Sequence, residues 1–229
     1  MSTRKPIEAL ESAKYFIKQI PVDTVGDAII QRSLSRLWMA APWTWSIGSG
    51  PGFNVETGVA SYDVEYPTDW GYAIKADLIV SDNLTQRPLQ IVSHIEDADG
   101  YKGQPSKVYF SGPAGLVNLA RISPVPTNTT GLPRVTSLYK RALPDYTGRA
   151  KYTTAVPFPD AWFYVFEEIV LWEAYRYGDN TRAGEAVVSG DKVQFSGQLA
   201  VAQAAIGEMR LREPLVLLTD EPMQKDPSK

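Results

Sequence analysis

A single histidine limits the acid–base and nucleophilic chemistry that this sequence could carry out. His94 is the only histidine among the 229 residues, so a Ser–His–Asp triad could form only around it. Its neighbours (QIVSHIED) have the composition of a strand, where one histidine is usually a surface or cross-strand residue. The absence of cysteine excludes disulfides, zinc–thiolate sites, iron–sulfur clusters and a cysteine nucleophile. We therefore expect no catalytic site based on histidine or cysteine.

Carboxylates are the remaining candidates for metal binding and acid–base catalysis. The acidic cluster at residues 96–99 resembles a calcium loop, but Ile95 and Ser106 occupy positions that an EF-hand fills with ligands. The acids within residues 63–69 have a spacing that a glycosidase could use, yet 26 acidic residues supply such spacings by chance. The glycines of residues 48–52 (GSGPG) are not followed by the helix that a phosphate-binding loop requires. The sequence predicts no metal, no cofactor and no enzymatic activity.

Aromatic residues are the third group that could bind a ligand. Trp43, Trp45, Trp70 and Tyr72 could stack on sugars or bases, as aromatic platforms do. The simpler interpretation is that Trp43, Trp45 and Trp70 pack in the core and at the hinge between a helical part and a sheet. We favour this second interpretation.

The composition indicates an ordinary globular protein. Apolar residues make up 44% and charged residues 21% of the chain. The formal net charge of -3 gives no support for a protein that coats DNA, although a positive groove could exist within this total. No apolar run approaches the length of a membrane span or a signal-peptide core, so we expect a soluble protein made in the cytoplasm.

Apolar periodicity predicts how the chain is organised. Residues 1–42 have helical spacing and proline boundaries, which predicts two helices, and Thr24 and Asp27 have capping-box spacing at the start of the second. Residues 43–150 alternate Gly, Pro, Asn and Asp with short β-branched and aromatic runs, which is typical of an antiparallel sandwich or barrel. Candidate strands are residues 53–57, 61–66, 73–81, 89–96, 107–111, 116–122 and 135–141.

Helical periodicity returns in residues 151–212. Asp160 could cap a helix that runs to Gly178, and a second helix is predicted over residues 190–212. Residues 213–229 have the composition of an extended arm. The predicted fold class is α+β: a helical bundle formed by both ends of the chain, with an inserted antiparallel β-sandwich or barrel-like region.

The helix over residues 161–177 is apolar on most of its sides. Only Glu167, Glu168, Glu173 and Arg176 supply charge, so the apolar surface is far wider than the usual stripe. Either the other helices and the sheet cover it, or one of its faces meets another copy of the chain. The second interpretation assigns a subunit interface to Trp162, Phe166, Ile169, Val170, Phe195 and Leu199.

Several short motifs carry a family resemblance through their order along the chain. They are Pro42-Trp43-x-Trp45, Tyr62 or Tyr66 followed by Pro67-x-Asp69-Trp70, Gly103-x-Pro105, Tyr139-Lys140-Arg141, Pro159-Asp160-x-Trp162 and Tyr177-Gly178-Asp179. In this order they resemble the head–tail adaptor proteins of short-tailed phages, also called connector or neck ring proteins. The resemblance covers roughly residues 25–210.

This resemblance implies a structural virion protein at the head–tail junction. Such proteins form a homo-oligomeric ring, commonly of about twelve copies, that docks on the portal, extends the channel for double-stranded DNA and offers a platform to tail, nozzle or fibre proteins. By the same resemblance the C-terminal segment is an arm that contacts the portal or a neighbouring subunit through Leu215, Val216, Leu217 and Leu218. The alternative is a module that binds the host surface or a carbohydrate through its tryptophans.

Overall fold

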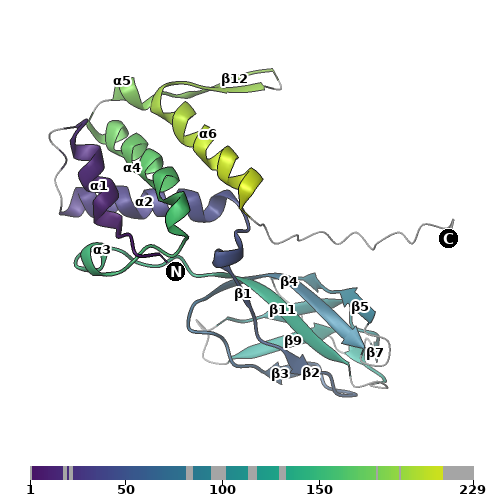
Figure 1. Cartoon of the computed structure of the whole chain (residues 1–229). Coiled ribbons are helices and arrows are strands. Elements are labelled where there is room, and N and C mark those ends of the chain that lie inside the picture. Colours follow the sequence, from purple (N-terminus) through teal and green to yellow (C-terminus); the bar gives the residue numbers. More distant parts are fainter. Residues whose placement is uncertain are drawn as a thin grey trace. The chain divides into compact units, whose positions relative to one another are not determined.

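The computed structural model describes residues 2–17, 20, 23–80, 85–93, 102–112, 118–128, 133–178, 180–190 and 192–213. Contacts divide the chain into two units, a helical unit of residues 1–46 and 143–216 and a β unit built on residues 47–142 (Figure 1). The fold is mixed α+β, which confirms the predicted class, and the described strands form no closed barrel.

The helical unit combines elements from both ends of the chain. Pro6 opens the first helix at a position where its missing N–H costs nothing. The elements are α1 (Pro6–Lys14), α2 (Thr24–Ala40), η1 (Thr44–Ser46), α3 (Ala150–Thr153), η2 (Asp160–Trp162), α4 (Phe163–Gly178), α5 (Asn180–Ala183), β12 (Ala186–Ser189), β13 (Lys192–Phe195) and α6 (Gly197–Arg212).

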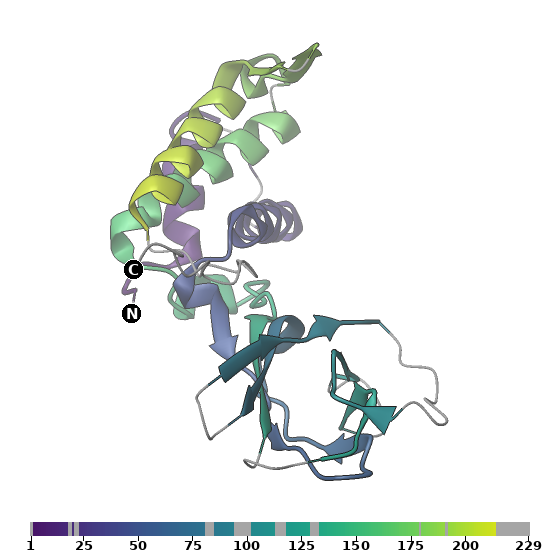
Figure 2. The ribbon, with the colours of Figure 1, turned by 90° about the vertical axis from the view of Figure 1, so that its right-hand side faces the viewer.

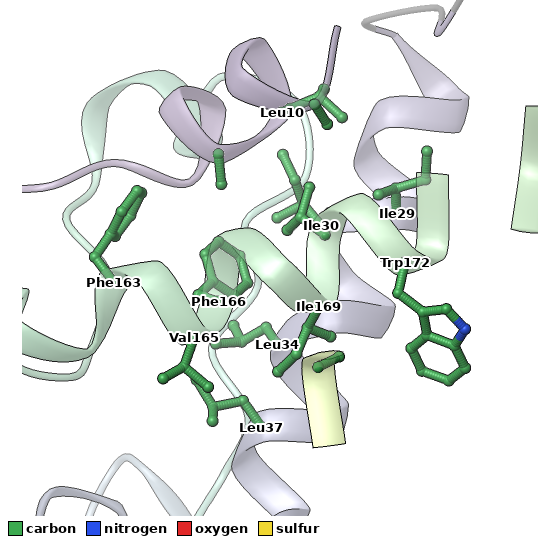
Figure 3. Close-up of a cluster of buried hydrophobic side chains, with 14 of the residues drawn as sticks. Leu10, Ile29, Ile30, Leu34, Leu37, Phe163, Val165, Phe166, Ile169 and Trp172 are labelled. Carbon is green, nitrogen blue, oxygen red and sulfur yellow. The ribbon is translucent and has the colours of Figure 1, made fainter. Parts of the chain in front are cut away.

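Helix α4 is the central helix of this unit, because α1, α2 and α6 all pack against it. Figure 3 shows side chains of α4 meeting Leu10 of α1 and Ile30, Leu34 and Leu37 of α2. Removing such a side chain from water stabilises the fold by about 1.5–3 kcal/mol. The wide apolar surface of α4 is therefore explained by burial within a single chain.

Two residues with capping spacing serve tertiary contacts instead. Asp27 does not cap α2; its carboxylate accepts hydrogen bonds from the buried Lys151 ammonium and from the Gly148 N–H at 3.0 Å. Asp160 does not cap the following helix; its carboxylate accepts from Ser2 Oγ and from the Thr3 N–H at 3.1 Å. Both carboxylates hold segments that are distant in sequence, which local spacing does not reveal.

The β unit contains two principal sheets. The strands of the unit are β1 (Ile47–Ser49), β2 (Phe53–Asn54), β3 (Ser61–Asp63), β4 (Trp70–Val80), β5 (Thr85–Pro88), β6 (Gln90–Ile91), β7 (Lys102–Gly103), β8 (Lys107–Phe110), β9 (Leu119–Ser123), β10 (Val125–Pro126) and β11 (Arg134–Arg141). One sheet has the order β1-β11-β4-β5, with β2 also paired to β11, and the other has the order β3-β9-β8-β6. Side chains of both sheets share one core, which includes Leu78, Val108, Ile122 and Val135.

The helix predicted over residues 190–212 is wrong in its first part. Helix α6 begins only at Gly197, and residues 186–195 form the antiparallel hairpin β12–β13, in which Phe195 is the last strand residue. The physical reason is that Gly190 has φ +60° at the hairpin turn, and the flanking runs are rich in valine. The hairpin extends from the helical unit in both views (Figures 1 and 2).

Candidate assembly surfaces

Most of the residues predicted to form the subunit interface are buried by their own chain. Phe166, Ile169 and Val170 are at most 1% exposed, and Trp162 and Leu199 are 9% and 7% exposed. All five belong to the core of the helical unit, because α1, α2 and α6 cover α4. In the single chain these five side chains are packed against its own helices, and their place in a subunit interface stays a prediction. Phe195 differs, since it is 42% exposed on β13.

The three tryptophans singled out by the sequence lie in the two cores. Trp43 is fully buried in the helical unit, where its indole N–H donates to the Leu37 carbonyl at 2.6 Å, and Trp45 stacks on it with ring centroids 6.0 Å apart. Trp70 is 7% exposed in the core of the β unit and stacks on Tyr139 at 4.9 Å. None of these three tryptophans therefore presents its ring as a flat binding surface for a sugar or a base.

The carboxylates considered for catalysis do not form a site. Asp63 is exposed, and Asp69 accepts a hydrogen bond from the Tyr139 hydroxyl at 2.5 Å and pairs with Arg141 at 3.3 Å. Burial, together with the Asp69 carboxylate, raises the pKa of Tyr139 to about 12. No group of three or more metal-binding side chains occurs among the described residues. His94, the acidic cluster at 96–99 and the arm residues 215–218 lie outside those residues.

The β12–β13 hairpin presents an apolar face that its own chain leaves exposed. The register pairs Ala186 with Phe195 and Val188 with Val193, so these four side chains share one face. Val188 is 71%, Val193 51% and Phe195 42% exposed. The opposite face carries Val187, Ser189, Lys192 and Gln194. A two-stranded hairpin is marginally stable in water on its own, so this face has the chemistry of a surface that another molecule covers.

The base of the hairpin is fixed by glycines and by a serine. Gly184 has φ +76°, and a Cβ on it would lie 1.9 Å from the Ser196 carbonyl oxygen. The Ser196 N–H donates to the Glu185 carbonyl at 3.0 Å, and the Ser196 hydroxyl accepts from the Glu185 N–H at 3.0 Å. Only glycine permits this close crossing of α5 and the start of α6. The apolar face therefore projects from an anchored base.

A groove of about 360 Å³ lies between α2, α4 and α6. Its apolar lining includes Met39, which is 63% exposed, together with Ile169, Trp172 and Ile206. Its charged lining residues are Arg36 and Arg210, and no carboxylate lines it. The groove thus combines an apolar floor with positive charge.

Arg36, which lines the groove, pairs with a buried carboxylate. Glu173, whose side chain is 2% exposed, accepts from Arg36 Nε and from Arg176 at 3.2 Å. The Arg36 guanidinium lies 4.2 Å from the centre of the Trp172 ring, which is a cation–π contact. Buried charge needs such pairing, because an isolated carboxylate would carry a large desolvation cost. These contacts fix Arg36 and Trp172 along the groove wall.

A family model with the description SU10 adaptor protein matches residues 18–218. The chain belongs to the SU10 adaptor protein family. This confirms the predicted resemblance at the level of a phage adaptor, and the protein is accordingly a structural component of a phage virion. No curated protein sequence matches it.

The family match of this SU10 adaptor covers both candidate surfaces. It includes α2, the β unit, the hairpin at residues 186–195 and α6, whereas α1 precedes it. Within the described part of the chain, no helix is both long and apolar enough to cross a membrane. Sequence reasoning missed the hairpin and the groove. The available signal for the hairpin was Gly190 between two short runs that contain valine. The groove forms only where three helices pack together, so no local pattern predicts it.

Proposed function

We propose that this SU10-family adaptor is a non-enzymatic subunit of a ring at the head–tail junction of a phage. The ring docks on the portal, extends the channel for double-stranded DNA and provides the platform on which tail, nozzle or fibre proteins attach. The observation that carries the proposal is the exposed apolar face of the anchored hairpin, on a chain of a phage adaptor family. A structural subunit needs such a self-association surface, whereas an isolated binding module does not.

A ring requires that the hairpin make a head-to-tail contact. We propose that its apolar face on the helical unit meets a different patch on the next copy. Contacts between two different patches close into rings when the rotation between copies allows it. The expected product is a closed ring of about twelve copies.

The charge of the chain agrees with passage of DNA instead of tight binding. A net charge of -3 provides few of the phosphate contacts that would hold a duplex. The arm residues 215–218 are proposed to contact the portal or a neighbouring copy. The alternative function, binding of a host-surface glycan, loses its main support because Trp43 and Trp70 are buried.

Paired substitutions on the two faces of the hairpin test the proposal. Val188→Asp places a charge on the apolar face, and Ser189→Asp makes the same change on the polar face one residue away. Because a carboxylate cannot be buried unpaired in an apolar contact, we expect Val188→Asp to prevent ring formation and Ser189→Asp to leave it intact. Light scattering after size exclusion, with the portal present, measures the mass. Rings of Val188→Asp with wild-type mass would contradict the proposed role of the hairpin.

A further inference from the structure

The residues that line the groove between α2, α4 and α6 include one buried donor without an acceptor and an exposed arginine. The indole N–H of Trp172 is buried and has no acceptor among the described residues. The Arg210 guanidinium donates to the Ala40 carbonyl and pairs with no carboxylate in the described chain. A buried donor without an acceptor is unfavourable, because its hydrogen bond to water is lost on folding. The groove is therefore suited to an occupant that brings acceptor oxygens and negative charge.

The apolar part of the groove sets a second requirement on the occupant. Met39, Ile169, Ala202 and Ile206 line the groove together with these donors. The occupant has to combine apolar side chains with carboxylates in a short stretch. Residues 214–221 (PLVLLTDE) have this composition, with four consecutive apolar residues followed by Asp220 and Glu221. This segment lies outside the described residues, and only its sequence is considered.

The length of the segment matches the groove. Ala202 and Arg210 are eight residues apart on α6, which corresponds to about 12 Å along the helix axis. Four or five extended residues span about 13–18 Å. The run 215–218 is therefore long enough to cover the apolar lining, with Asp220 and Glu221 close to the arginine side chains.

We infer that the α2–α4–α6 groove binds residues 214–221 of a second copy of this chain. The inference deepens the proposed ring function and rests on it for the presence of that second copy. The complementarity is of charge as well as of apolar surface, because the groove is lined by Arg36 and Arg210 and the segment carries two carboxylates. A segment and a groove on different parts of one chain make a head-to-tail contact, the type that closes into rings.

The backbone at the end of α6 favours a second copy over the chain's own groove. Glu213 is extended, with φ -78° and ψ 131°, and its carboxylate is held by the Trp162 indole N–H at 2.6 Å. Pro214 follows, and a proline restricts the preceding residue to such extended conformations. Up to Glu213 the chain therefore does not turn back along α6, which favours a segment supplied by a second copy.

Binding of a synthetic peptide with the sequence of residues 213–222 to the full chain tests the inference. Fluorescence anisotropy of the labelled peptide gives the affinity at concentrations too low for the chain to assemble. We expect Arg210→Glu to weaken binding at least about tenfold, because a charge-assisted contact becomes a repulsion. Arg212→Glu is the matched control, since Arg212 carries the same charge nearby, is exposed and pairs with Glu208 instead of lining the groove. Replacing Asp220 and Glu221 of the peptide by the corresponding amides should weaken binding similarly.

Three results would overturn the inference. They are absence of peptide binding to the wild-type chain, unchanged binding by Arg210→Glu, and an equal loss in Arg212→Glu. The full chain with Leu217→Asp tests whether the groove is filled by the segment of the same chain or by that of another copy. Its peptide affinity should equal that of the wild type, and a tenfold gain would mean that the segment fills its own groove. Because the assay uses single chains, peptide binding without rings would contradict the ring function alone, and rings without peptide binding would contradict this inference alone.

Discussion

At the residue scale, Asp160 connects the N-terminal segment to the start of α4. Hydrogen bonds from the Ser2 and Thr3 side chains, and from the backbone N–H groups of Thr3 and Arg4, lower the pKa of Asp160 to about 2 from an ordinary value of 3.8. A carboxyl whose pKa is lowered by folding contributes stability above its ordinary pKa and loses it as the pH falls through the lowered value. The attachment of the N-terminal segment should therefore be complete at neutral pH, weaken as the pH falls below about 4, and be half lost near pH 2.

We predict that the Asp160 carboxyl resonance titrates with a midpoint near pH 2 and that the amide resonance of Thr3 follows it. In Asp160→Ala the Thr3 amide should lose this titration, because its acceptor is gone. Carboxyl and amide chemical shifts recorded by NMR as a function of pH check both statements. A wild-type midpoint near the ordinary value of an aspartate would show that the hydrogen bonds are not formed in solution.

The same residues show what local sequence could and could not predict. Thr24 with Asp27, and Asp160 before a helical run, have the spacing of caps, and the helices do begin nearby. The carboxylates nevertheless bind Lys151 and the N-terminal segment, which are over a hundred residues away in sequence. The N–H groups at the start of a helix compete for a nearby carboxylate with every other donor that the fold brings close. The outcome of that competition depends on tertiary structure.

At the element scale, α4 and the β12–β13 hairpin differ in whether their own chain covers their apolar surface. Helix α4 is apolar because its own chain covers it, whereas the hairpin is apolar on one face that its own chain leaves open. Periodicity predicted the existence of α2, α4 and several strands correctly, because each has a strong pattern of its own. It extended α6 into the hairpin because a short run rich in valine carries little information on period.

We predict that truncation of a central α4 side chain strongly destabilises the helical unit. Phe166 is fully buried, so Phe166→Ala should lower the free energy of unfolding by about 4 kcal/mol through lost burial and a cavity. Tyr164, also on α4, is 38% exposed and bonds Glu208 at 3.0 Å. Tyr164→Ala should cost only about 1 kcal/mol.

Urea unfolding followed by far-ultraviolet circular dichroism measures both changes on the same scale. If the two variants lost equal stability, α4 would not be the buried centre of the helical unit. If Phe166→Ala were as stable as the wild type but failed to assemble, the result would support the predicted place of this side chain in a subunit interface.

At the scale of the whole molecule, the order of short motifs carried more functional information than any single one. Motifs from Trp43 to Gly178 predicted a phage adaptor, and the family match over residues 18–218 confirms that level. The two-unit division follows from helices at both ends enclosing a strand-rich middle. The assembly surfaces could not be predicted in the same way, because the hairpin face depends on strand register and the groove depends on the packing of three helices.

The mass of the purified protein, alone and mixed with its portal, tests whether the chain assembles into a ring. Light scattering after size exclusion distinguishes a monomer of 25.3 kDa from a closed ring. We predict either a ring in the protein alone or a monomer that becomes a ring of about twelve copies on the portal. A stable monomer that does not bind the portal would contradict the account.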